Sequence, residues 1–226
     1  MTPPRLRCAA IVATLLVARP CLAHAQWALE GFLGTSISAH SPLTIRQAGY
    51  PTLKFTADYA TRPTDPSIYY AVRLSRWWTR WGGVAGYVHQ KLYLTNNPPE
   101  VQSFKVTYGY NLVGIGAGYL TRGWAFIGTV GPVVSNPASE VRGIEFQHEG
   151  GIFGSGNHVG GFNLQVGANR RFRFAGWGFA TADLRLSAAW TDVPVAEGNA
   201  DVPNYAIHLL LGVGVGKRRP GRRKAP

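Results

Sequence analysis

Residues 204–216 read NYAIHLLLGVGVG, and this stretch decides the fold. Large apolar side chains occupy every second position, beginning at Tyr205 and ending at Val215. The positions between them carry His208, Leu210 and small residues. A period of two sustained over ten or so residues predicts a β-strand with one apolar face.

The same alternation recurs along the chain and predicts eight strands. They cover residues 27–38, 66–77, 83–95, 102–120, 124–135, 159–171, 177–190 and 204–216. Short connections at 78–82, 121–123 and 172–176 alternate with mostly longer ones at 39–65, 96–101, 136–158 and 191–203. This pattern predicts an all-β fold, an eight-stranded antiparallel up-and-down transmembrane β-barrel.

The barrel hypothesis assigns the apolar face of each strand to lipid. In residues 102–120 it places Phe104, Val106, Tyr108, Tyr110 and Leu112 outside. All seven tryptophans fall near predicted strand ends, as is typical of side chains at a membrane interface. A soluble sandwich or lipocalin-like barrel, with the apolar face inward, is the alternative architecture.

Composition excludes several other classes. Hydrophobic residues make up 46% of the 226 residues, which argues against disorder. The 28 glycines are spread through every segment, and glycine destabilises helix interiors, so a helical bundle is also disfavoured.

The N-terminus is predicted to be a cleaved signal peptide, residues 1–25. Arg5 and Arg7 precede an eleven-residue apolar run, and Ala23-His24-Ala25 offers small residues at a cleavage site. A short amphipathic helix of the fold is the alternative. Cleavage leaves the barrel at 26–216 and removes both cysteines, so thiol chemistry is not expected in the mature chain.

The formal charge of +12 is concentrated at the chain ends. Three of the 23 basic residues lie before Gln26 and six lie after Gly216, which leaves 14 basic and 11 acidic residues between them. The segment 217–226 is predicted to be a basic disordered tail. A barrel body so near neutrality gives no reason to expect nucleic acid as a partner.

With these features, the chain resembles the small eight-stranded outer-membrane β-barrel proteins of Gram-negative bacteria. The resemblance implies export to the outer membrane as a monomer. It also implies two kinds of partner, the outer-membrane lipid, including lipopolysaccharide, and the outer-membrane assembly machinery. The chain departs from the family where Lys217–Pro226 follow the last strand, since such barrels commonly end on an aromatic residue.

Polar positions on the second face of the strands are expected inside the barrel. They are Glu30, Arg73, Ser75, His89, Lys91, Lys105, Asn111, Asn163, Gln165, Asp183, Arg185 and His208. Eight strands enclose a space just wide enough for side chains to fill. Both charge signs occur, so we expect an ion-paired plug, with a structural or surface-interaction role for the protein. A narrow polar path or small ligand cavity, as in a channel or carrier, is an alternative.

A lipid A-modifying enzyme is the other alternative, because the resemblance extends to deacylases and palmitoyltransferases built on barrels of this size. Deacylases of that kind carry a His-x-Ser pair with a nearby carboxylate, whereas His40 and Ser41 are adjacent here. The candidate catalytic residues are His89, Asn111 and His208, or the loop set His148, Glu149, Ser155 and His158. No motif predicts a cofactor, and the histidine spacing predicts no metal site.

Overall fold

The computed structural model describes residues 26–148 and 150–216, so the predicted signal peptide and basic tail lie outside the described residues. Eight long strands form the wall: β1 (Gln26–Ser38), β5 (Tyr70–Trp77), β6 (Trp81–Leu94), β7 (Val101–Thr121), β8 (Trp124–Val141), β10 (His158–Arg173), β11 (Gly178–Val195) and β13 (Asn204–Gly216). Shorter elements are β2 (Ser41–Gln47), β3 (Leu53–Ala57), β4 (Tyr59–Ala60), β9 (Ile144–Gln147), β12 (Gly198–Asp201) and the 3₁₀ turn η1 (Ile152–Gly154).

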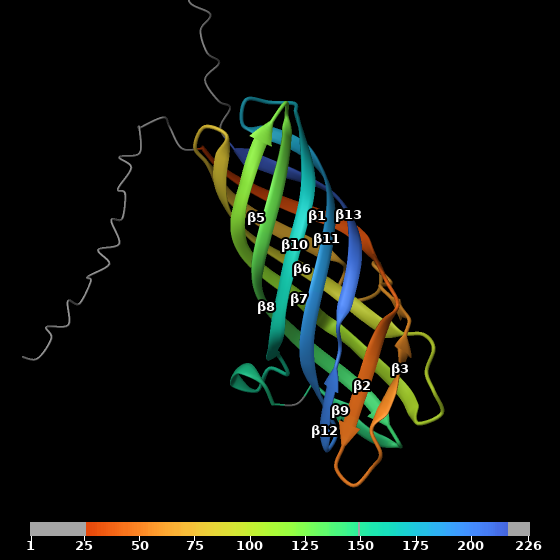
Figure 1. Ribbon diagram of the computed structural model, residues 1–226. Coiled ribbons are helices and arrows are strands. Elements are labelled where there is room, and N and C mark those ends of the chain that lie inside the picture. The colour runs from red at the N-terminus through yellow and green to blue at the C-terminus, as the bar shows by residue number, and fades with distance from the viewer. Residues whose placement is uncertain (1–25, 149, 217–226) are drawn as a thin grey trace, which may run out of the picture.

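The eight wall strands form a closed antiparallel ring. Each pairs with the next along the chain, and β1 pairs with β13 from Ala28↔Gly216 to Ser38↔Ala206. The predicted all-β, eight-stranded antiparallel barrel is therefore confirmed. Figure 1 shows the strands running obliquely around the barrel.

The two ends of the barrel differ. At the turn end, where Gln26 and Gly216 lie, the connections 78–80, 122–123 and 174–177 are short. At the loop end, β2, β3, β9 and β12 continue the sheet beyond the wall (Figure 1). The sequence predicted loops in 39–65, 136–158 and 191–203, so these strands correct that prediction. The fifth strand includes Pro132 and continues past its predicted end at residue 135, through Pro137, to Val141.

Side chains alternate between the two faces of the wall. On β13, the exposed fractions of Leu209 and Leu211 are 52% and 70%, whereas those of His208 and Leu210 are 0% and 2%. The apolar face therefore points outward over this part of the barrel, which is the inverse of a soluble barrel.

In the half of β7 toward the loop end the apolar side chains point inward instead of outward, which corrects the sequence-based assignment. Phe104, Val106, Tyr110 and Leu112 are buried, and of the five residues assigned to the outside only Tyr108 is exposed. A two-residue bulge between Val106 and Tyr110 shifts the register against β8. Toward the loop end, the buried side chains form an apolar core with Leu43, Ile45 and Val193, which is the arrangement expected where an outer face meets water.

Six tryptophans lie on the outer wall or in the turns, but Trp77 does not. Its ring is 3% exposed and packs inside the turn end with Val84 and Ala125. Its indole Nε1 donates to Ser75 Oγ at 2.9 Å. Trp77 therefore helps to fill the barrel interior at this end.

Gly109 makes the bulge possible, and Gly109→Ala tests this. Its φ of +129° is in a region that favours glycine, and an added Cβ would lie about 2.2 Å from the Asn111 side chain. We expect a loss of about 1–3 kcal/mol in unfolding free energy, measured by denaturant titration of the refolded barrel. Gly128→Ala is the control, since an added Cβ there meets nothing within 4 Å. Equal effects at the two glycines would contradict the role of Gly109.

Candidate functional site

The middle of the barrel interior is occupied by a buried ion-pair network centred on Arg73 of β5. Its guanidinium donates to both oxygens of Glu30, at 2.9 and 3.0 Å, and to Asp183 Oδ2 at 2.6 Å. Arg73, Glu30 and Asp183 are at most 5% exposed. Glu30 lies on β1 and Asp183 on β11, so the network joins strands that are not neighbours in the ring.

Two further arginines extend this network to the other side of the interior. Arg171 of β10 also donates to both Glu30 oxygens, at 3.1 and 2.7 Å. Arg185 donates to Asp183 Oδ1 at 3.2 Å and to Gln165 Oε1 at 2.9 Å. Each carboxylate is thus shared by two arginines, which satisfies groups that would be costly to bury alone.

Amide side chains complete the network next to β7 and β8. Gln165 Nε2 donates to Asn163 Oδ1 at 2.7 Å. Asn163 Nδ2 in turn lies within 3.0 Å of the carbonyl oxygens of Val113, Gly131 and Pro132. A space of about 10 Å³ remains at this level, beside Arg73, Gln165 and Asp183, which is at the lower limit for a single water.

Of the polar residues that the sequence places inside, the structure buries Glu30, Arg73, Ser75, Lys91, Asn163, Gln165, Asp183, Arg185 and His208. Lys105 differs: it is exposed and lies opposite Tyr93 on the outer face of the loop end. The reason is that Lys105 alternates with Phe104 and Val106, whose apolar side chains are buried, so this part of β7 turns its apolar face inward and Lys105 outward. Lys91 is buried outside the interior, at a β6 irregularity, where its Nζ donates to the Asp65 carbonyl at 3.1 Å.

His89 and Asn111 also face outward rather than into the barrel. They pair across β6 and β7, and His89 pairs with Tyr70, whose neighbour Ala71 faces inward. His89 Nδ1 and Tyr87 Oη lie 2.8 and 2.7 Å from Asn111 Oδ1, and the Tyr70 ring stacks on His89. Both residues are 5% exposed, so this cluster is a covered polar patch on the outer wall.

His208 lies inside the barrel, away from that patch. Its ring nitrogens contact the Tyr69 hydroxyl and, at 2.7 Å, Ser187 Oγ. A Ser–His contact is one requirement of nucleophilic catalysis. However, His208 is 0% and Ser187 6% exposed. The first candidate set, His89, Asn111 and His208, is therefore not brought together.

In the loop set, the described contacts of Ser155 and His148 are with groups other than each other. Ser155 Oγ donates to the Ile152 carbonyl at 2.7 Å and accepts from Asn157 Nδ2 at 2.9 Å. His148 Nδ1 contacts Asn136 Oδ1 instead. His158 heads β10, and Glu149 lies outside the described residues. Within residues 26–148 and 150–216, no group of three or more His, Cys, Asp or Glu side chains could hold a metal ion.

The sequence analysis missed four interior residues that matter here: Tyr69, Trp77, Arg171 and Ser187. Arg171 and Ser187 continue the alternation set by Gln165 and Asp183, so the period alone could have identified them. Tyr69 lies four positions before Arg73 within the predicted strand 66–77, so the period could have identified it as well. Trp77 is predicted at the membrane interface, and its inward orientation depends on the closed wall.

Several solved structures are similar to this chain. Ail, the attachment invasion locus protein of Yersinia pestis, is 10% identical, with 85% of this chain and 97% of that chain covered, at a TM-score of 0.37. The outer membrane protein AlkL is 11% identical, with 89% and 93% covered, at 0.44. The monoaromatic hydrocarbon channel CymD is 8% identical, with 85% and 88% covered, at 0.20. No protein-family model and no curated protein sequence matches the chain.

Removing Arg73 should destabilise the barrel far more than removing an exposed arginine. Arg73→Gln leaves Glu30 and Asp183 short of a buried partner, for which we expect a loss of about 3–5 kcal/mol in unfolding free energy. Arg46→Gln is the control, because its ion pair with Asp201 is about half exposed and should contribute less than about 1 kcal/mol. Denaturant titration measures both variants. A smaller loss for Arg73→Gln than for the control would contradict the network's role.

Acidification should loosen the segment around His148. Burial, and then the charge of Lys105, lower the pKa of His148 below its ordinary value of 6.5. The open state therefore binds a proton more readily, so stability is complete above the ordinary pKa and is lost as pH falls through the lowered one. Amide protection in Ile144–Gln147, corrected for intrinsic exchange, should fall on acidification.

His148→Gln should remove most of this pH dependence, since glutamine keeps a neutral hydrogen-bonding side chain beside Asn136. His40→Gln is the control at an exposed histidine that pairs with Asp58. An unchanged pH profile in His148→Gln would show that another group is responsible.

Proposed function

We propose that this protein is an outer-membrane β-barrel with a closed polar interior, whose folded loop end provides a surface for interactions outside the membrane. Its residence in the outer membrane would follow cleavage of residues 1–25. The proposal has three supports, which are the outer wall, the interior and the loop end.

The outer wall is the observation that carries the proposal. Leu164, Val166, Leu184, Leu186 and Leu209 are each 46–58% exposed. Such a wide apolar surface would be a liability in water but is expected against lipid. None of the described helices is long and apolar enough to cross a membrane.

Aromatic side chains border this surface on both sides. At the loop end, Trp190 stacks on Phe162 and donates to Tyr205 Oη at 3.0 Å. At the turn end, Trp124 and Phe172 are exposed. The ten steps from Phe162 to Phe172 on β10, at ~3.4 Å each and a tilt of about 45°, span about 24 Å. This matches the height of about 25 Å expected for a lipid-facing band.

The filled interior argues against a channel or carrier. Arg73, Glu30 and Asp183 meet across the middle of the barrel, and Trp77 fills the interior between them and the turn end. An ion or small molecule would have to break several charge-assisted hydrogen bonds to pass.

The loop end supports an interaction role because it is folded rather than a set of open loops. Arg46 pairs with Asp201 at 2.6 Å and so joins β2 to β12. Arg142 donates to Gln47 Oε1 at 2.9 Å and to the Pro51 carbonyl at 2.6 Å. A fixed surface loses less entropy on binding than mobile loops do. We propose lipopolysaccharide and other outer-membrane lipid as its immediate surroundings, the assembly machinery as a transient partner, and a monomer as the working form.

Fractionation and conductance test this proposal together. The mature protein should fractionate with the outer membrane and migrate differently on gels before and after boiling, because a closed barrel resists detergent. Reconstituted into a planar bilayer, it should show no resolved conductance steps. Recovery in the soluble fraction would contradict the membrane location.

Two other outcomes would select the alternatives. Reproducible conductance steps would favour a channel. A change in the acylation of lipid A on expression, absent with the empty vector, would favour a lipid-modifying enzyme. Neither is expected, because the interior is filled, His89 and Asn111 lie apart from His208, and Ser155 is hydrogen-bonded to the Ile152 carbonyl and to Asn157.

A further inference from the structure

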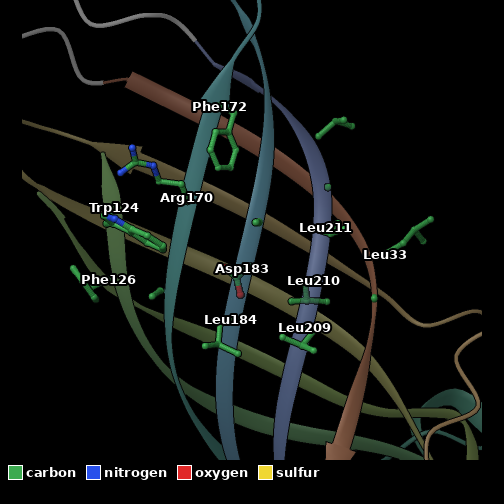
Figure 2. Close-up of a pocket in the computed structure, with 15 residues that line it drawn as sticks. Leu33, Trp124, Phe126, Arg170, Phe172, Asp183, Leu184, Leu209, Leu210 and Leu211 are labelled. Atoms are coloured by element: carbon green, nitrogen blue, oxygen red, sulfur yellow. The ribbon is translucent and has the colours of Figure 1, made fainter. Parts of the chain in front are cut away.

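The outer wall contains a hollow in its half toward the turn end, and Figure 2 shows its lining. Trp124 and Phe126 of β8 border it on one side, and Leu33 and Leu211 on the other. The space between them measures about 1470 Å³. Its depth results from small residues on the two central strands, Ala168 of β10 and Ala182 of β11, both on the outward face.

One cation lies at the turn-end side of this hollow. Arg170 of β10 is paired with Trp124 of β8 on one side and with Ala182 of β11 on the other. All three residues line the hollow. Its guanidinium carbon lies 5.4 Å from the centre of the Trp124 ring, and its Nη1 donates to the Arg122 carbonyl at 2.8 Å. This position near a strand end lets the long side chain reach the headgroup region.

Among the described residues, no acidic group neutralises the charge of Arg170. Across residues 26–148 and 150–216, no carboxylate lies within ion-pairing distance of its guanidinium. Asp183 directly follows Ala182, the residue opposite Arg170 on β11, but its carboxylate faces inward and pairs with Arg73 and Arg185. Arg170 therefore retains donors for an external anion, and phosphate is the anion available at a lipid headgroup.

We propose that this hollow binds one glycerophospholipid of the membrane leaflet at the turn end, with its phosphate on Arg170 and an acyl chain over Ala168 and Ala182. The proposal rests on the membrane location proposed above. The apolar walls suit an acyl chain, and Arg170 at the turn-end side sets the direction in which the lipid lies. Trp124 lies under the guanidinium, as is typical of aromatic residues at the membrane interface.

Lipid retention measured by native mass spectrometry tests the site. Mature protein is reconstituted in vesicles of phosphatidylethanolamine and phosphatidylglycerol, extracted into detergent, and followed as bound lipid is lost. Arg170→Gln removes the charge, and Ala182→Leu fills the hollow. We expect each to lose bound phospholipid about tenfold faster than the wild type, and dioleoylglycerol, which lacks phosphate, not to be retained by any form.

Two control variants match these changes elsewhere on the outer wall. Arg76→Gln removes an outward arginine that contacts the rings of Trp27 and Trp78 but does not line the hollow. Ala85→Leu enlarges an exposed alanine on β6. Both should retain lipid as the wild type does.

Three outcomes would overturn the site. They are wild-type retention in both Arg170→Gln and Ala182→Leu, equal losses in the controls, or a bound mass corresponding to a second copy of the chain. Every variant is also checked for heat-modifiable migration and for flotation with vesicles. A wild type that fails these checks contradicts the membrane location itself, whereas a wild type that passes them but retains no lipid contradicts the site alone.

Discussion

The pairing of β1 with β13 closes the sheet, and the other features of the wall depend on it. Eleven residue pairs from Ala28↔Gly216 to Ser38↔Ala206 leave the wall strands with no free edge. Closure also creates an interior into which every second side chain must point. Charged groups there have little contact with water, so Glu30, Arg73 and Asp183 each pair with two partners of opposite charge. Glu30 accepts two hydrogen bonds from each of its two arginines.

The direction of the apolar face changes along the barrel axis. Over the part of the wall toward the turn end, apolar side chains such as Leu209 point outward and polar ones such as His208 point inward. Toward the loop end, Phe104 and Val106 point inward, and Lys105 points outward. Two environments explain this change, since the same strand would cross from lipid into water. On β7 the change falls between Ile115, which is exposed, and Leu112, which is buried.

Alternation in the sequence predicted the eight wall strands and most of the interior polar residues, because it reports directly which positions share a face. It could not reveal that β7 turns its apolar face inward from Leu112 to Phe104, so it predicts Lys105 and Asn111 inside although both face outward. It also gave no sign of β2 and β12, whose register depends on pairing between segments far apart in the chain. The candidate catalytic histidines shared a residue type but not a location, and only the fold separates His89 from His208.

A nitroxide scan along β13 in lipid vesicles tests most directly the claim that this barrel faces lipid with its apolar side. Both cysteines of the sequence, Cys8 and Cys21, precede Gln26, so a chain begun there allows single labels without background. Labels at 207, 209, 211 and 213 should be accessible to lipid-dissolved oxygen, whereas labels at 206, 208, 210 and 212 should be shielded from it. The opposite alternation, or access of a water-soluble relaxation agent to the first set, would contradict the account.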